Sequence, residues 1–220
     1  MILDFHSHVL PGIDHGSDSL KTSIKQLELA RKYGITDIVA TSHFYPHSNT
    51  VNVFLDRRDA AYELLLESAR GFGVNLLLGA EILMCSAIES YPQIDRLCIR
   101  GTKILLLELP YADFQSGYCR SVFKLISSGY EVVMAHADRY DPSWIEETLE
   151  AGAKLQLNAT ALSLFSRKRY LSWLEKGKVV AIGSDIHRLN KMAFRAFSRA
   201  SKFVSKYPAI TEFSSRILQK

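Results

Sequence analysis

The sequence predicts an α/β protein whose parallel strands close into a barrel. Apolar runs of strand length alternate with longer segments of helical period along most of the 220 residues, and this alternation is typical of a parallel sheet. Six of the seven predicted strands end in a histidine or a carboxylate side chain. In a closed α/β barrel the carboxyl ends of the strands meet at one rim, where active sites are built. The six polar strand ends therefore predict one shared site.

The first predicted elements are a strand, a helix and a second strand. Residues 1–5 are apolar except for Asp4, and residues 19–33 carry apolar side chains at a helical spacing. Gly34 is expected to end this helix in a left-handed conformation. Residues 35–40 form a buried strand that leads to His43.

The remaining elements alternate in the same way. The predicted strands are 74–80, 103–107, 131–135, 154–157 and 178–183; the predicted helices are 52–70, 115–128, 141–152, a helical stretch from 159 through 176, and one or two helices in a tail broken near Pro208. Gly71 is expected to end the long helix 52–70. Asp141 and Pro142 are a strong start signal for the helix that follows them. Residues 82–101 show no regular period.

The bulk composition is typical of one globular domain. At 220 residues, with 47% hydrophobic and 23% charged residues, the chain is long enough for one buried core and short for two, so residues 1–220 are expected to form a single domain. The apolar runs are too short to span a bilayer, and no basic segment precedes an apolar one at the start. We therefore expect a cytoplasmic protein without membrane insertion. The three scattered cysteines indicate free thiols.

The charge is mildly basic, with a net value of +4. Much of the excess lies in Arg167-Lys168-Arg169 and in residues 191–220. This balance suits an anionic substrate, but it predicts no nucleic-acid binding. A solvated basic helix face is the expected structure of the tail.

His6 and His8 end the first strand on the same face, because strand side chains alternate. Two neutral imidazoles can share one metal ion, and the turns that follow can bring Asp14 back over the pair. The pair alone is a weak signal, and the alternative is two surface histidines near a terminus. Metal-capable side chains recur, however, at the ends of later strands: His43, Glu81, Glu108, His136, Asp185 and His187.

These motifs together resemble the polymerase-and-histidinol-phosphatase (PHP) superfamily. The similar segments are residues 6–8, 10–14, 40–43, 79–82, 107–110, 135–140 and 184–187. Within the superfamily, their order and context most resemble the bacterial manganese-dependent protein-tyrosine phosphatases of capsule and exopolysaccharide systems. The resemblance covers residues 1 to about 190 and implies a distorted (β/α)7 barrel, similar to a TIM barrel, with two to three divalent metal ions.

The resemblance also implies roles for individual residues. The implied metal ligands are His6, His8, Asp14, His43, Glu81, Glu108, His136, Asp185 and His187. Arg139 matches an arginine that binds the substrate phosphate, and Asp14 and His43 are expected to serve catalysis as well. Manganese is the expected metal, with iron or zinc as alternatives. Glu81 and Asp185 are the candidates for bridging two ions.

The chain departs from the family pattern at several positions. The family often has a second histidine where Phe44 stands, and Pro-Glu where Ala137-Asp138 stands. A further catalytic arginine usually follows the last histidine. Here Arg188 and Lys191 are the nearest cations, at a shifted spacing. Arg188 is a candidate catalytic residue, and whether Arg188 or Lys191 replaces the arginine is left open.

The leading hypothesis is a metal-dependent phosphomonoesterase that acts on phosphotyrosine in proteins, including a bacterial tyrosine kinase or its targets. A phenolate leaving group, with a pKa of about 10, needs less protonation than an alkoxide. One alternative is a small-molecule phosphatase acting on a phosphate ester such as histidinol phosphate. Another is an amidohydrolase or nuclease on a similar barrel, although Glu108 stands where such enzymes carry a bridging lysine. A metal-binding regulator without turnover is the third. The oligomeric state is left open.

Tyrosines lie in the predicted loops at the same rim. Tyr45, Tyr111 and Tyr140 can line a pocket for an aromatic ring, but packing is the expected role of at least two of them. His15 and His47 are expected to be exposed loop residues. Asp4 either orients an imidazole or is a carboxylate at the strand edge without such a role.

Overall fold

The computed structural model describes residues 2–111 and 114–219, in which parallel strands alternate with helices. The strands are β1 (Leu3–Ser7), β2 (Asp37–Ala40), β3 (His43–Phe44), β4 (Asn75–Leu78), β5 (Glu81–Leu83), β6 (Ile104–Glu108), β7 (Glu131–Met134), β8 (Lys154–Asn158) and β9 (Val179–Gly183). The α-helices are α1 (Leu20–Lys32), α2 (Val51–Gly71), α3 (Gly117–Ser127), α4 (Pro142–Glu150), α5 (Leu171–Glu175), α6 (Lys191–Val204) and α7 (Pro208–Leu218). Short 3-10 helices are η1 (Ile88–Ser90), η2 (Ile94–Leu97), η3 (Ala137–Arg139), η4 (Ala159–Leu162) and η5 (Arg167–Tyr170).

The prediction of seven strands needs one correction, because two of them are each split into two pieces. The predicted strand 35–40 continues past a break as β3, and 74–80 continues as β5. One sheet has the order β1-β2-β4 and the other β3-β5-β6-β7-β8-β9, and every pair is parallel. Backbone bonds across the breaks, from Gly79 N to Ala40 O and from Glu81 N to Ser42 O, join the two sheets.

The two outer strands of this series, β1 and β9, meet at their carboxyl ends. Asp185 N donates to His6 O at 2.8 Å, and His8 N donates to Ile186 O at 3.1 Å. Gly183 makes this approach possible, because a Cβ added there would lie 2.5 Å from the His6 Cβ. The strands therefore form the expected distorted α/β barrel, and its carboxyl ends share one rim.

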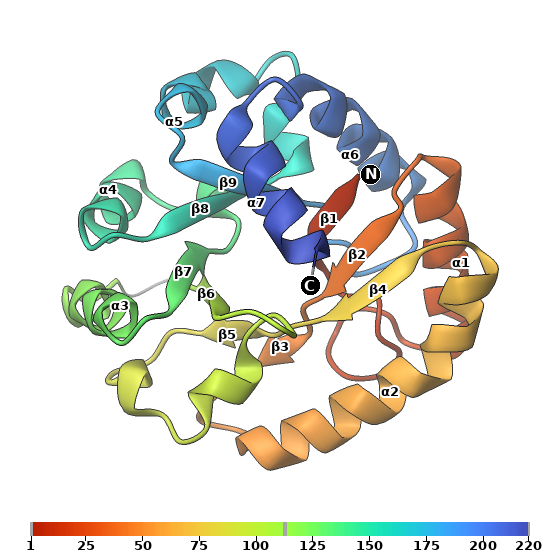
Figure 1. Ribbon diagram of the computed structural model, residues 1–220, viewed down its shortest axis with the longest axis horizontal. Coiled ribbons are helices and arrows are strands. Elements are labelled where there is room, and N and C mark those ends of the chain that lie inside the picture. Colours follow the sequence, from red (N-terminus) through yellow and green to blue (C-terminus); the bar gives the residue numbers. More distant parts are fainter. Residues whose placement is uncertain (1, 112–113, 220) are drawn as a thin grey trace.

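Helices surround the strands, and α7 closes the end of the barrel opposite the rim. Figure 1 shows α1 to α6 in an outer ring and α7 lying across the middle. Phe213 of α7 packs edge-on against Phe5 at a ring separation of 5.4 Å, and both side chains are buried. Arg216 of the same helix pairs with Glu131, the first residue of β7. The amino ends of the strands are thus covered, and the carboxyl ends are left for the site.

Local signals in the sequence predicted most helix ends, with two corrections. Helix α2 ends at Gly71 as expected, but Gly71 itself is helical, and the left-handed residue that follows the helix is Gly73, with φ +66°. The expected helical stretch 159–176 consists of η4, η5 and the short α5. The first residue of the predicted strand 1–5 lies outside the described residues. In the described part of the chain no helix combines the length and the apolar character needed to cross a membrane.

Candidate metal centre

The predicted ligands gather at the rim, and Glu81 lies at their centre. The Glu81 Oε2 atom lies 3.1 Å from His6 Nε2, 3.2 Å from His8 Nε2 and 3.1 Å from His43 Nδ1. The other Glu81 oxygen lies 2.8 Å from His136 Nε2. Glu81 has this position because it begins β5 in register with His43 of β3. One carboxylate therefore contacts four imidazoles that lie in or just after three strands, β1, β3 and β7.

The other two rim carboxylates lie on opposite sides of this centre. Glu108, the last residue of β6, lies 3.5 Å from His43 and 3.4 Å from His136. Asp185, just after β9, places Oδ1 between 3.4 and 3.6 Å from the nitrogens of three histidines: His6, His8 and His187. The two carboxylates thus face different imidazoles: Glu108 faces two of them, and Asp185 faces three others.

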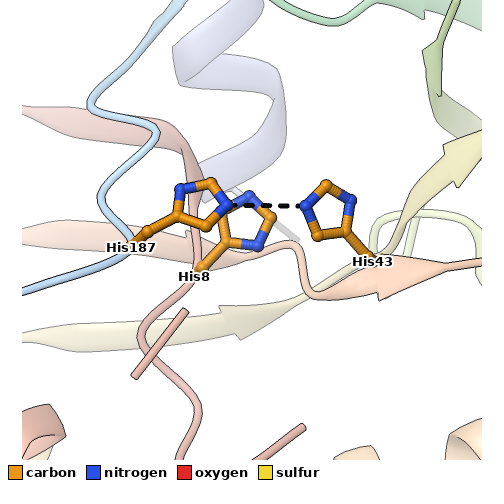
Figure 2. Close-up of side chains that lie close together, drawn as sticks. All are labelled: His8, His43 and His187. Carbon is orange, nitrogen blue, oxygen red and sulfur yellow. Dashed lines mark hydrogen bonds between the residues drawn. The ribbon is translucent and has the colours of Figure 1, made fainter. Parts of the chain in front are cut away.

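Three groups of side chains in the described residues can each hold a metal ion, with donor atoms within 4.8 Å of one another. They are His6-His8-Glu81, His43-Glu81-Glu108 and His8-His43-His187. Glu81 belongs to two of the groups, which fits its expected role as a bridge between ions. Figure 2 shows the third group, in which the Nε2 atoms of His187 and His43 face each other at 3.5 Å.

Asp14 occupies a different position from the other predicted ligands. Its Oδ2 lies 2.8 Å from His8 Nδ1 and accepts a hydrogen bond from the backbone N–H of His43 at 2.9 Å. Asp14 belongs to none of the three donor groups in the described part of the chain. In this geometry it holds the His8 ring and the start of β3 in place.

Gln156, which sequence reasoning missed, orients two of the imidazoles. Its Oε1 accepts from the backbone N–H of His136 at 2.6 Å, and it lies 2.9 Å from His6 Nδ1. Because this oxygen can only accept, His6 donates from Nδ1 and keeps a free lone pair on Nε2. The signal was a polar residue in an apolar strand, two positions before Asn158 and therefore on the same face of β8.

His8 and His187 are oriented in the same manner. His8 Nδ1 contacts the Asp14 carboxylate, and His187 Nδ1 lies 3.0 Å from the backbone oxygen of Asp185. Each ring therefore presents Nε2 toward the cluster. Outer partners of this kind fix the tautomer that a metal ion requires.

The electrostatics of the cluster favour positive charge at its centre. Burial lowers the pKa of His8, but Asp14, Asp185 and Glu81 outweigh it and raise that pKa well above its usual range. His136 responds in the same way: burial opposes its charged form, and Glu108 and Glu81 raise its pKa to about 9. Burial and the nearby His8 lower the pKa of His187 to about 4, so this ring stays neutral. The carboxylates thus stabilise positive charge at the centre of the cluster.

Divalent metal ions fit this donor set. Within the described residues, Glu81 Oε2, Asp185 Oδ1 and His43 Nδ1 are buried and have no aligned hydrogen-bond partner, an arrangement that is costly unless another ligand satisfies them. Mixed carboxylate and imidazole donors suit manganese, iron or zinc. The cluster also contains two of the four described non-glycine residues with positive φ, His136 at +29° and Asp185 at +50°. Strain of this kind concentrates at functional sites.

A cavity of about 470 Å³ opens above the cluster. Its lining includes His43, Glu108 and His187 from the cluster, together with Arg139 and two tyrosines, Tyr45 and Tyr111. Tyr45 stacks on His43 at a ring separation of 5.3 Å. Packing was the expected role of at least two of the three rim tyrosines, yet only Tyr140 is buried, with its hydroxyl donating to Leu109 O.

Arg139 projects into this cavity from η3. Its guanidinium pairs with Asp185 and donates to the Tyr111 hydroxyl at 2.9 Å. Burial opposes its charge, but Asp185 and Tyr111 outweigh burial and raise the pKa of Arg139. The side chain is 36% exposed, so it is held in place and still reaches the open cavity.

The other two predicted cations, Arg188 and Lys191, do not line the cavity above the cluster, and neither does Phe44, which departs from the family pattern. Arg188 is exposed and lines a neighbouring cavity with Asp14 and His15, and Lys191 is an exposed residue at the start of α6. Phe44, where the family often has a histidine, is fully buried against Phe54 and Tyr91.

Three further expectations have mixed outcomes. His47 is exposed as expected. His15 is exposed too, but its ring stacks on His43 at 4.7 Å and on His187 at 4.4 Å. Asp4 accepts from the backbone N–H of Ser184 at 2.8 Å rather than from an imidazole ring.

Comparison with known proteins places these residues in a family context. The sequence model of the family described as capsular polysaccharide synthesis, CpsB/CapC, matches residues 2–215. The chain is 28% identical over 207 residues to the tyrosine-protein phosphatase YwqE of Bacillus subtilis, an alignment that covers 88% of this chain and 80% of YwqE. It is 23% identical over 209 residues to the tyrosine-protein phosphatase CpsB of Streptococcus pneumoniae, covering 86% of this chain and 84% of CpsB.

Solved structures agree on the fold. A chain from the crystal structures of YwqE and CpsB, described as unique metal-dependent tyrosine phosphatases, superposes with a TM-score of 0.79 at 24% identity, covering 99% of this chain and 94% of that one. The TatD-like protein of Archaeoglobus fulgidus superposes with a TM-score of 0.59 at 14% identity, covering 99% and 100% of the two chains. Both likenesses support the α/β barrel.

Proposed function

The chain belongs to the CpsB/CapC family of capsular polysaccharide synthesis proteins, and from this membership we propose that it is a metal-dependent protein-tyrosine phosphatase. The observation that carries the proposal is the Glu81-centred cluster, which holds three possible metal-binding groups beneath a cavity lined by two tyrosine rings and an arginine. Relatives that align with most of this chain are named tyrosine-protein phosphatases. We propose phosphotyrosine in a protein as the substrate.

The cluster residues would hold two to three divalent ions. His6, His8, His43, Glu81, Glu108, His136, Asp185 and His187 are the proposed ligands, and Asp14 is a proposed ligand or positioning residue. When bound, such ions activate water and neutralise the oxygens of a phosphate ester. Manganese is the proposed metal, because the set combines carboxylate oxygens with imidazoles and contains no soft thiolate or thioether donor.

The protein side chains would bind and orient the substrate. Arg139 can grip phosphate oxygens through its guanidinium, which matches their geometry. The rings of Tyr45 and Tyr111 flank the cavity and can contact the phenyl ring of phosphotyrosine. Arg188 lies in the adjoining cavity, so it would reach the residues beside phosphotyrosine more readily than the phosphate itself.

The partner and the location are part of the proposal. We propose that the phosphotyrosine belongs to a bacterial tyrosine kinase or to one of its targets, and that the protein acts in the cytoplasm. The support is the family, whose description concerns capsular polysaccharide synthesis.

The test compares substrates with purified protein that has been stripped by a chelator and resupplied with manganese, iron(II) or zinc. We expect manganese to restore hydrolysis of p-nitrophenyl phosphate and of a phosphotyrosine peptide, with little activity on a phosphoserine peptide or histidinol phosphate. Glu81→Gln should lower kcat by on the order of 1,000-fold, because it removes the charge shared by two donor groups. His47→Ala, an exposed histidine outside the cluster, should leave activity unchanged.

Each other outcome points to a different function. Preference for histidinol phosphate would favour a small-molecule phosphatase. Bound metal without turnover of any phosphate ester would contradict the proposal and favour a regulator or an amidohydrolase.

A further inference from the structure

An apolar tip projects from the loop between η4 and η5. Leu164 is 70% exposed and Phe165 is 96% exposed, the two highest values among the exposed large hydrophobic side chains. Neither side chain lines any of the cavities described above. Two adjacent apolar side chains this exposed cost free energy in water and mark an interaction surface.

Hydrogen bonds hold this tip in a defined turn. The hydroxyls of Ser163 and Ser166 lie 2.7 Å apart, and the Ser166 hydroxyl donates to Ala161 O at 2.6 Å. Arg167 N donates to Ser163 O at 3.0 Å, which closes the turn. The two apolar side chains between the serines are therefore presented outward by the backbone.

The tip is surrounded by positive charge. Residues 159–206 contain eleven lysines and arginines and two acidic residues, so the rest of the chain is net negative. Lys168 and Arg169 follow the tip directly and are exposed. The exposed side of α6, which packs beside η4, carries a basic stripe: Lys191, Arg195, Arg199 and Lys202.

In the part of the chain that the structure describes, these cations have no acidic partner. In residues 2–111 and 114–219, no carboxylate forms an ion pair with Lys168, Arg169 or the basic stripe of α6. Arg167 stacks on the Phe203 ring of α6 at 4.6 Å, so the tip and the helix form one surface. The charge of this surface is available to an external anion.

We propose that this surface docks on an anionic lipid bilayer, with Leu164 and Phe165 entering the headgroup layer and the surrounding lysines and arginines contacting lipid phosphates. A convex apolar tip flanked by cations fits a bilayer, which is flat and deformable, whereas a peptide partner needs a groove that the tip does not form. Charge complementarity decides the lipid class, because cations are attracted to anionic headgroups and not to zwitterionic ones.

Docking of this kind would keep the metal centre near the bilayer. Residues 159–170, which comprise η4, the loop with the tip and η5, begin directly after Asn158, whose side chain donates to Asp185 at 3.2 Å. This segment carries the tip. It ends at Arg169 and Tyr170, which line a cavity of about 260 Å³ together with Ala137 and Asp138 of η3. The docking surface therefore adjoins the rim, while α7 covers the other end of the barrel. The proposal stands whether or not the chain is a phosphatase.

The experiment measures co-sedimentation of the full chain with phosphatidylcholine vesicles and with vesicles containing 30% phosphatidylglycerol. We expect binding only to the anionic vesicles, and weaker binding as salt rises. The double variants Leu164→Ser/Phe165→Ser and Lys168→Gln/Arg169→Gln should each lower the partition coefficient roughly ten-fold. The matched controls are Leu64→Ser/Phe123→Ser and Lys21→Gln/Lys25→Gln, exposed side chains on other helices that should bind like the parent protein.

Three outcomes would overturn the proposal. The first is no binding to anionic vesicles at low salt by protein with an intact circular dichroism spectrum. The second is equal loss in the matched controls, which would indicate a general charge effect. The third is no loss with Leu164→Ser/Phe165→Ser, combined with a raised KM for a phosphoprotein in Lys168→Gln/Arg169→Gln, which would assign the surface to protein docking. Hydrolysis of p-nitrophenyl phosphate by the same variants tests the proposed function separately.

Discussion

At the scale of single residues, the site depends on buried polar groups whose partners come from distant parts of the sequence. Glu81 contacts His6, His43 and His136, and each pairing joins a different strand end. The candidate metal ligands could be predicted from the sequence, because histidine and carboxylate side chains are recognisable by their chemistry. The role of Gln156 could not, because an amide in a strand has no predictable role until its neighbours are known.

Gln156→Met tests the orienting role of this amide. Methionine keeps the volume but leaves His6 Nδ1 and His136 N without their acceptor, so we expect manganese affinity to fall by about 10- to 100-fold. Titration of metal-stripped protein measures this change. Gln26→Met is the control, because the buried Gln26 amide has no partner in the described residues and its removal should not weaken metal binding. Equal affinities in the parent and Gln156→Met would contradict the role.

Thiol reactivity should separate the three cysteines by their surroundings. Burial, and after it Asp95, raise the pKa of Cys98 to about 12, so at pH 8 only about one molecule in 10,000 carries the reactive thiolate there. Burial also raises the pKa of Cys85 and Cys119, but both are only half-buried. Ellman's reagent at pH 8 should therefore modify two thiols in the folded protein and the third only after unfolding. Modification of all three thiols at the same rate in the folded protein would contradict the low reactivity expected of Cys98.

At the scale of elements, the breaks and joins between strands shape the rim. β2 and β4 end at Ala40 and Leu78, and after a short break the chain resumes as β3 and β5, which begin with the proposed ligands His43 and Glu81. Periodicity could not reveal these breaks, because the residues on both sides of each are equally buried. The joining of β1 to β9 depends on a close backbone approach that only the folded chain shows.

Gly183→Ala should disrupt this approach. The new Cβ would lie 2.5 Å from the His6 Cβ and 2.9 Å from the Gln156 amide nitrogen, so β1 and β9 would have to move apart. We expect a loss of about 1–3 kcal/mol in the free energy of unfolding and weaker metal binding, measured by urea titration and metal titration. Gly71→Ala is the control: it lies in α2 with open space around it and should stabilise the protein by about 0.5–1 kcal/mol. An unchanged free energy of unfolding in Gly183→Ala would mean that β1 and β9 are less closely packed at this position.

At the scale of the whole molecule, the apolar core and the polar site occupy different parts of one barrel. A core of apolar side chains that includes Phe5, Leu106 and Phe213 fills the barrel near α7, and a second core lies between the strands and the outer helices. The rim above them is polar. We propose that residues 1–220 form one domain, because the β1 and β9 ends of the chain complete the same barrel.

Metal binding should stabilise the entire barrel. The proposed ligands come from almost every strand end, so an ion bound there stabilises only the folded chain. At 100 times the dissociation constant, manganese should add about 2.7 kcal/mol and raise Tm by about 5–10 °C relative to chelator-treated protein. Differential scanning calorimetry with and without metal measures the shift. Glu81→Gln should abolish most of it, and an unchanged Tm in the parent protein would exclude tight binding to the cluster.

The sequence by itself determined the fold class, the order of the elements and the set of metal-capable side chains, because hydrophobic periodicity and ligand chemistry are local properties of the chain. Tertiary structure alone decided how those side chains share the site. It placed Glu81 at the centre and Asp14 behind His8, and it brought Gln156 to His6 and Arg139 to Asp185. It also left Leu164 and Phe165 uncovered beside exposed lysines and arginines. These relations depend on distances between strand ends, which arise only when the barrel closes.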